Sequence, residues 1–384
     1  MPVEVVPYDP GWPHLFEAES ERVRRALGRL VDGGALEDLE HLGSTSVPGL
    51  VAKPTIDMMG RIHPYPPSPA SVAALAAIGY TWRGEYGLPG RTYFTKGPHD
   101  FHLHLIDMAS EHWERHIVFR DYLRAHRHAQ ERYATLKLDL AELFRFDRPA
   151  YQDGKTDLIR ELSQEASAWQ LQATGFSPIE RVASWFEGVP DDGTWAVASG
   201  WALDLHTGAP SRYHDDVDVE VTGDRQTLVQ RHLLESGWRL DQVIEGCRYL
   251  PWSDGEPLAP GTHQAHARRD GQFLDLLFAP RGEDTWRFRR DERVTLPLKR
   301  ALLNATLPSG RPVKYLAPEV VLLFKSRSSQ TGQEAGPRAK DANDFARVAP
   351  SLGAEAREWL QNALRTVHGE HPWLAELTGD GSGR

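Results

Sequence analysis

The sequence reads SGWALD at residues 199–204 and RYHDDVDV at residues 212–219. The first stretch places a serine–glycine turn before an apolar helix, and the second places Asp216 and Asp218 one residue apart on an apolar strand. Because alternate residues of a strand project to the same face, these two carboxylates lie side by side. Carboxylates held that close repel each other, and a divalent cation between them relieves the repulsion. The pattern therefore predicts a metal site at Asp216 and Asp218.

A third carboxylate fits the same chemistry. Asp275 stands in the apolar run FLDLL at residues 273–277, where an ionised side chain is costly unless it is paired or bound to a metal. Attack of a hydroxyl on a nucleotide α-phosphate requires charge to be neutralised on the attacking and leaving oxygens, which carboxylate-bound cations provide. These residues indicate phosphoryl or nucleotidyl transfer, with Asp275 as a third metal ligand or as the acceptor of the hydroxyl proton.

Two further motifs follow, PEVVLLFK at residues 318–325 and KDAND at residues 340–344. Together with the turn and the aspartates, they resemble the aminoglycoside nucleotidyltransferase group of the DNA polymerase β-like nucleotidyltransferase superfamily, over most of residues 178–350. The resemblance implies Mg²⁺ or Mn²⁺ on Asp216 and Asp218, with Asp275 as general base or third ligand. It also implies ATP or another nucleoside triphosphate as co-substrate and a small-molecule hydroxyl acceptor such as an aminoglycoside.

The turn departs from that family in one respect. The resemblance implies that Ser199 and Gly200 line the triphosphate, since a glycine turn lets backbone N–H groups approach phosphate oxygens. The family turn usually reads Gly-Gly or Gly-Ser, whereas this chain reads Ser-Gly, and the Cβ of a serine narrows the allowed backbone. In the helix that follows, we expect Trp201 to pack in the core and Asp204 to lie on a helix face.

Basic residues complete the site that the resemblance implies. Arg212 and His214 would support the carboxylate strand, and Lys325 or Lys340 would contact phosphates. Acidic residues farther on are expected to attract a cationic acceptor: Glu245, Asp254 and Glu256.

The first half carries motifs of its own: HLGSTSVPGL at residues 41–50, AKPTID at 52–57, HLH at 102–104 and FRDYLRAH at 119–126. They resemble the GrpB family over about residues 1–165. The resemblance implies a nucleotidyltransferase-like fold but no defined activity.

The chemistry of the first half differs from that of the second. Met59 stands where a second aspartate would follow Asp57, and a thioether is a poor ligand for Mg²⁺. His102 and His104 share a strand face, so that with Asp57 they form either a transition-metal site or a set of hydrogen-bonded structural imidazoles. Polar and basic side chains in this half are expected to hold a phosphate-bearing ligand without catalysis: Gly43, Ser44, Ser46, Lys53, Arg91 and Lys96.

The bulk properties suit two α+β domains. The 384 residues carry a formal net charge of −10, with no basic excess in either half, which disfavours a nucleic-acid partner. Both halves follow one order of helix, strand, Gly/Ser turn and Asp-bearing strand. We expect nucleotidyltransferase-like domains at residues 1–168 and 178–370, a linker at 169–177 and a flexible tail at 371–384. The single cysteine, Cys247, and the absence of a signal peptide or an apolar membrane segment favour a cytoplasmic protein.

Three functions remain compatible with these residues. The first is a metal-dependent nucleotidyltransferase acting on a small molecule. The second uses the same catalytic residues on a protein or an RNA, and the third is a non-catalytic nucleotide-binding or scaffold protein. The position of Asp275 relative to Asp216 and Asp218 discriminates between the enzymatic and the non-catalytic interpretations.

Overall fold

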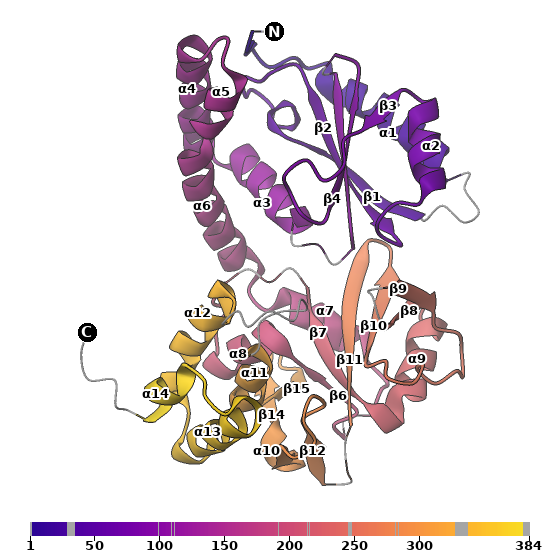
Figure 1. Ribbon diagram of the computed structural model, residues 1–384, viewed down its shortest axis with the longest axis vertical. Coiled ribbons are helices and arrows are strands. Elements are labelled where there is room, and N and C mark those ends of the chain that lie inside the picture. The colour runs from indigo at the N-terminus through magenta and orange to yellow at the C-terminus, as the bar shows by residue number, and fades with distance from the viewer. Residues whose placement is uncertain are drawn as a thin grey trace. The chain divides into compact units, whose positions relative to one another are not determined.

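A computed structural model describes residues 2–28, 35–98, 100–108, 110, 112–190, 192–212, 214, 216–244, 248–280, 282, 284–326 and 337–378. The chain divides into two compact units, Met1–Ala173 and Thr174–Arg384, each built around a mixed β-sheet with flanking helices (Figure 1). Within the described ranges, no helix has the length and apolar character needed to cross a bilayer.

The first unit holds a five-stranded sheet in the order β1-β2-β5-β4-β3, in which only β2 and β5 are parallel neighbours. Its strands are β1 (Ala35–Leu42), β2 (Ile56–His63), β3 (Tyr80–Trp82), β4 (Arg91–Lys96) and β5 (Phe101–Ile106). Its helices are α1 (Trp12–Leu27), η1 (Ser44–Ser46), α2 (Pro69–Ala77), α3 (His112–Ala125), α4 (Arg127–Leu143), α5 (Arg148–Asp153) and α6 (Thr156–Thr174). Figure 1 shows α1 and α2 on one side of this sheet and α3 and α4 on the other.

The central strand β2 is buried on both faces of this sheet. Met58 packs with Val23 in the core beneath α1, and its neighbour Met59 packs with Trp113 on the opposite face. This alternation places the odd-numbered residues of β2, Asp57 included, on the α3 side of the sheet.

The second unit holds an eight-stranded sheet in the order β14-β15-β6-β7-β11-β10-β8-β9. Its strands are β6 (Trp195–Val197), β7 (Asp218–Thr222), β8 (Arg239–Ile244), β9 (Arg248–Pro251), β10 (Gln264–Arg269), β11 (Gln272–Ala279), β14 (Leu302–Thr306) and β15 (Pro312–Leu316), with a separate hairpin of β12 (Thr285–Arg287) and β13 (Thr295–Pro297). Its helices are α7 (Ser177–Trp185), α8 (Ser199–Thr207), η2 (Gly223–Arg225), α9 (Gln226–Glu235), α10 (Leu298–Ala301), α11 (Pro318–Lys325), α12 (Ala339–Val348), η3 (Ala349–Ser351), α13 (Ala354–His368) and α14 (Trp373–Thr378).

The sheet of the first unit recurs inside the sheet of the second. The strands β6-β7-β11-β10-β8 repeat the order and the strand directions of β1-β2-β5-β4-β3, with the parallel pair at the same place. A helix precedes the first strand of each set (α1 and α7), and another follows the second strand (α2 and α9). The predicted α+β class and the repeat of motif order are confirmed.

Three segments differ from expectation. The segment 169–177, expected to be a linker, is mostly helical, because α6 continues to Thr174 and stops only at Gly175, which has a positive φ of 50°. The tail expected to be flexible contains α14, whose Trp373 stacks on Phe345 with ring centroids 4.2 Å apart, while residues 379–384 lie outside the described ranges. Asp216 lies just before β7 rather than inside the strand.

Candidate active site

The turn between β6 and α8 adopts the backbone that its serine disfavours. Ser199 has a φ of 53°, in the left-handed region that glycine adopts most easily, and its hydroxyl hydrogen-bonds to Asp218. A Cβ on Gly200 would lie 2.3 Å from Cε1 of His214 and 2.9 Å from Nη2 of Arg212. Gly200 is therefore required by the two side chains packed against the turn, and Ser199 is tied to the carboxylate strand.

The three predicted carboxylates come together. Asp218 opens β7 and pairs in register with Asp275 on the parallel strand β11, and Asp216 is two residues before Asp218. Burial, followed by the charge of Asp216, raises the pKa of Asp218 to about 7. Burial and the charges of Asp218 and Asp216 raise the pKa of Asp275 well above its ordinary value, and burial also raises the pKa of Asp216. Burial and mutual repulsion therefore disfavour the charged form of these acids.

One side chain orients the third carboxylate. The amide of Gln264 donates to both oxygens of Asp275, at 2.9 and 2.7 Å. The Nε2 atom of His266 lies 4.0 Å from Oδ1 of Asp275. Asp275 is thus fixed on β11 with its carboxylate directed toward β10 and the other two acids within electrostatic reach.

A buried network holds the loop that carries Asp216. His214 donates to Asp204 at 2.6 Å, and Asp204 also accepts from Ser211 and from Arg347. Burial alone would raise the pKa of Asp204, but the bonds from His214 and Ser211 hold it below its ordinary value. The expected support from His214 is thus present, and Asp204 is a fully buried anchor rather than a residue on a helix face.

Trp201 has a second role besides the core packing expected for it. Its ring is buried, and its Nε1 donates to the backbone carbonyl of Asp216 at 3.0 Å. An acid and an indole inside an otherwise apolar helix were the signal in the sequence, since both need polar partners when buried.

Lys325, expected to contact phosphates, forms ion pairs inside the unit. Its buried ammonium lies 2.9 Å from Asp341 and 2.9 Å from Asp344, and its charge also lowers the pKa of Asp218. Arg212 also donates to Asp344, at 3.2 Å. Lys340 is the basic residue whose charge most lowers the pKa of Asp216, and both lysines lower the pKa of Asp218.

The donor set at this site fits Mg²⁺. Asp216, Asp218 and Asp275 offer the hard oxygens that this cation prefers, and their mutual repulsion is what a divalent cation would relieve. Across the described ranges, no group of three or more His, Cys, Asp or Glu side chains is already gathered tightly enough to enclose a metal ion.

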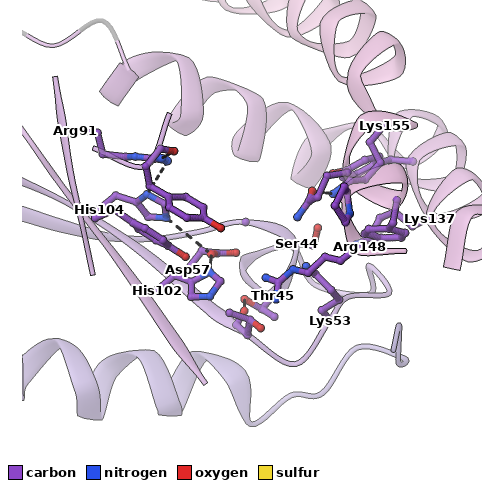
Figure 2. A pocket seen from close by; sticks show the side chains of 18 residues that line it. Ser44, Thr45, Lys53, Asp57, Arg91, His102, His104, Lys137, Arg148 and Lys155 are labelled. Carbon is purple, nitrogen blue, oxygen red and sulfur yellow. Dashed lines mark hydrogen bonds and ion pairs between the residues drawn. The ribbon is translucent and has the colours of Figure 1, made fainter. Parts of the chain in front are cut away.

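The first unit contains a pocket of about 580 Å³ beside the equivalent strands. Gly43, Ser44 and Lys53 line it, as expected, together with Asp57 from β2. Figure 2 shows Arg91 and His104 on one side of the pocket, with Asp57 and His102 next to them. Four basic side chains lie on the opposite side: Lys53, Lys137, Arg148 and Lys155. The two other side chains expected here bind elsewhere, because Ser46 donates to the carbonyl of Gly43 and Lys96 pairs with Glu19 at 2.6 Å.

Asp57 is held by histidines and not by a second acid. Nδ1 of His102 donates to Oδ1 of Asp57 at 3.0 Å, and Nε2 of His104 lies 4.0 Å from the same oxygen. Burial would raise the pKa of Asp57, but the hydrogen bond from His102 and the nearby imidazole of His104 hold it below its usual range. A Cβ on Gly43, whose φ is 67°, would lie 2.4 Å from Oδ2 of Asp57. This geometry suits the hydrogen-bonded alternative better than a transition-metal site.

The strand registers show which residues of the two units correspond. Asp57 pairs with His102 across the parallel strands β2 and β5, as Asp218 pairs with Asp275 across β7 and β11. Asp57 is therefore equivalent to Asp218, and His102 stands where the second unit has its third carboxylate.

The first unit therefore lacks a carboxylate at Thr55, which is two residues before Asp57 and occupies the position equivalent to Asp216. The expectation that Met59 marks this position is wrong, because Met59 packs in the core with Leu42 and Trp113. The sequence alone did not distinguish the two alignments, since both keep the same face of the strand.

Sequence reasoning missed three basic residues of the pocket. Lys137, Arg148 and Lys155 come from α4, from the start of α5 and from the residue before α6, between 94 and 112 residues beyond Gly43. The signal was a lysine on the apolar face of a helix, since Lys137 follows the buried Tyr133 by four positions. Of the other calls, Asp254 pairs with Arg231 and Glu256 is exposed, and Glu245 and Cys247 lie outside the described ranges.

Comparisons with known proteins cover the two units separately. The family described as GrpB protein matches residues 2–165, and the family described as aminoglycoside-2''-adenylyltransferase matches residues 189–251. The solution structure of the antibiotic-resistance factor ANT(2'')-Ia is 19% identical, covering 50% of this chain and 92% of its own, with a TM-score of 0.36.

Curated relatives share the first unit. The UPF0157 protein YqkA of Bacillus subtilis is 36% identical over 44% of this chain and 48% of its own length, so the chain spans about half of that relative. A UPF0157 protein of Halalkalibacterium halodurans is 35% identical over 43% of this chain and 83% of its own length. Through its first unit, the chain belongs to the GrpB family.

Proposed function

We propose that the second unit is a divalent-cation-dependent nucleotidyltransferase that moves a nucleoside monophosphate from ATP or another nucleoside triphosphate to a hydroxyl of a small molecule. The observation that carries the proposal is the register of β7 and β11, which sets Asp218 beside Asp275 with Asp216 just before the strand. The adenylyltransferase match over residues 189–251 covers the turn and the first two of these acids, and supports the same reaction.

The side chains divide the work of the reaction. Mg²⁺ on Asp216 and Asp218 would neutralise charge on the transferred phosphate and on the leaving pyrophosphate. Asp275, oriented by Gln264, accepts the proton of the acceptor hydroxyl. The acceptor oxygen then bonds to the α-phosphorus, and the bond from that phosphorus to the oxygen of the β-phosphate breaks to release pyrophosphate. The turn at Ser199 positions the triphosphate against these acids.

An aminoglycoside is the acceptor class that we propose to test first, because the matching family is named for it. The full chain would be incubated with Mg²⁺, each of the four nucleoside triphosphates and a mixture of aminoglycosides, and the products would be analysed by mass spectrometry. We expect an acceptor whose mass rises by one nucleoside monophosphate, together with released pyrophosphate.

The variant Asp216→Asn/Asp218→Asn should lose this product, whereas a control that removes two exposed acids of the same unit, Glu187→Gln/Asp224→Asn, should retain it. Absence of any adduct with the wild-type chain, or equal product from the Asp216→Asn/Asp218→Asn variant, would overturn the proposal.

A further inference from the structure

The pocket of the first unit carries positive charge that the proposed reaction does not use. Four basic side chains gather at one end of it, from the loop before β2 and from the segments α4 to α6 (Figure 2): Lys53, Lys137, Arg148 and Lys155. The proposed nucleotidyl transfer belongs to the second unit, so these residues need a separate explanation.

Two of these lysines are buried, which is uncommon for the side chain. Lys137 is 3% exposed and Lys155 is 8% exposed. Among the described residues, the only carboxylate whose charge stabilises Lys53, Lys137 or Lys155 is Asp57, which already accepts a hydrogen bond from His102. The positive charge at this end of the pocket therefore exceeds the negative charge that faces it.

The ammonium groups retain unused hydrogen-bond capacity. Each ammonium has three donors. Lys137 donates to the backbone carbonyl of Val51, and Lys155 donates to Gln152 at 2.6 Å. Their other contacts are faces of aromatic rings, with Nζ of Lys155 4.7 Å from the centroid of Tyr151 and Nζ of Lys137 5.1 Å from that of Tyr133. Oxygens of an anion can take the remaining N–H groups.

Burying these lysines close together lowers the stability of the ligand-free chain. Burial, followed by the charges of neighbouring lysines, lowers the pKa of Lys137 to about 7 and that of Lys155 to about 8. An apolar side chain at either position would avoid this cost, whereas a bound anion would offset it. The arrangement thus costs stability in the absence of an anion.

We propose that this pocket binds the di- or triphosphate group of a phosphorylated small molecule directly, with Lys53, Lys137 and Lys155 contacting phosphate oxygens and without a divalent cation. The volume of about 580 Å³ is that of a typical small-molecule site and leaves room beyond the phosphates. Arg91, whose guanidinium lies 5.1 Å from the ring centroid of Tyr93, lines the other end, where a planar group of the ligand would stack. We expect binding without a metal because the first unit lacks two of the three acids: the positions equivalent to Asp216 and Asp275 are Thr55 and His102.

Calorimetry with inorganic tripolyphosphate in EDTA tests this proposal on the full chain. We expect the wild-type chain to bind, and the variant Lys137→Gln/Lys155→Gln to bind at least about tenfold more weakly, because two charged hydrogen-bond donors to the phosphates are lost. Glutamine at residue 137 retains an N–H for the carbonyl of Val51, so the helix keeps its anchor.

Two controls keep the outcome interpretable. Arg127→Gln/Arg160→Gln removes two positive charges from exposed positions of the same unit and should bind within about twofold of wild type, since exposed charges are screened. Asp216→Asn/Asp218→Asn should also bind normally, which separates this site from the proposed reaction. No metal-free binding by the wild-type chain, or an equal loss in the arginine control, would overturn the proposal. Urea denaturation of the lysine variant should show a free energy of unfolding no lower than that of wild type, and a lower one would assign its weaker binding to misfolding and remove the support.

Discussion

The two units place different chemistry on one strand arrangement. In the first, Leu42 pairs with Asp57; in the second, the N–H of Ala198 donates to the carbonyl of Asp218 at 2.9 Å. The next residue has a positive φ in both units, 67° at Gly43 and 53° at Ser199. Yet the second unit gathers three acids, whereas the first keeps one acid between histidines and faces it with lysines. A shared sheet thus sets where side chains meet, and a few substitutions decide whether acids or basic residues gather there.

The largest expected effect is on catalysis in the acid cluster. Asp275→Asn should lower the rate of nucleotidyl transfer roughly 10²–10⁴-fold, because the amide cannot accept the hydroxyl proton. The rate would be measured as pyrophosphate release with Mg²⁺, ATP and the acceptor found by mass spectrometry. Asp224→Asn, on the exposed turn η2, serves as the matched control. An Asp275→Asn chain that turns over at the control rate would remove Asp275 from the reaction.

Two buried lysines should respond to the same substitution to different extents. Lys325→Met removes the cation that Asp341 and Asp344 share, leaving them to Arg338 and Arg212, and should lower the free energy of unfolding by about 3 kcal/mol. Lys137→Met removes a charge that has no bonded carboxylate together with the donor to the carbonyl of Val51, so the ligand-free stability should change by less than about 1 kcal/mol. Urea denaturation followed by tryptophan fluorescence measures both. Equal destabilisation by the two substitutions would mean that Lys137 is a structural lysine like Lys325.

The equivalent turn positions offer a smaller test. Gly43→Ser copies the second unit into the first and should lower the free energy of unfolding by about 1–3 kcal/mol, because the new Cβ meets Asp57 at a positive φ. Ser199→Gly relieves strain but loses the bond to Asp218, so that stability should change by less than about 1 kcal/mol. Thermal unfolding of the two variants beside wild type measures both effects. An unchanged unfolding temperature for Gly43→Ser would contradict the equivalence of the two turns.

The smallest expected effect is the pH dependence of anion binding. Lys137 and Lys155 have pKa values of about 7 and about 8, so they are charged below those values and neutral above them. The charged and titratable groups around them are Lys53, Arg148, Asp57 and Tyr133. Tripolyphosphate affinity in EDTA should therefore fall several-fold from pH 6 to pH 9, although the ligand itself gains negative charge over that range.

The same titration has the opposite sign for folding. The ammonium pKa values are lower in the folded chain than in the unfolded one, so the ligand-free chain should become more stable as the pH rises through 7 to 8. The Lys137→Gln/Lys155→Gln variant should lack both trends, and affinity that rises with pH in the wild-type chain would contradict the assignment.

The sequence predicted the local parts of this account well. Asp216 and Asp218 were found by their spacing of two residues and Asp275 because it interrupts an apolar strand, and the repeat was visible in the order of turns and strands. Contacts set by tertiary packing were not accessible in the same way. Lys325 looked available in the sequence because its partners, Asp341 and Asp344, belong to another helix. The register that matches Thr55 with Asp216 depends on which strands pair. The pocket lysines stand far along the chain from Gly43, and only the folded unit brings them together.

The central claim is that equivalent places in the two units take ligands by opposite electrostatics. Calorimetric titration with ATP, first in EDTA and then in Mg²⁺, tests it on wild type, Lys137→Gln/Lys155→Gln and Asp216→Asn/Asp218→Asn. The account predicts a metal-free binding event that only the Lys137→Gln/Lys155→Gln substitutions abolish. It also predicts an additional Mg²⁺-dependent event that only the Asp216→Asn/Asp218→Asn substitutions abolish. A single event lost in both variants, or a metal-dependent event removed by the lysine substitutions, would contradict it.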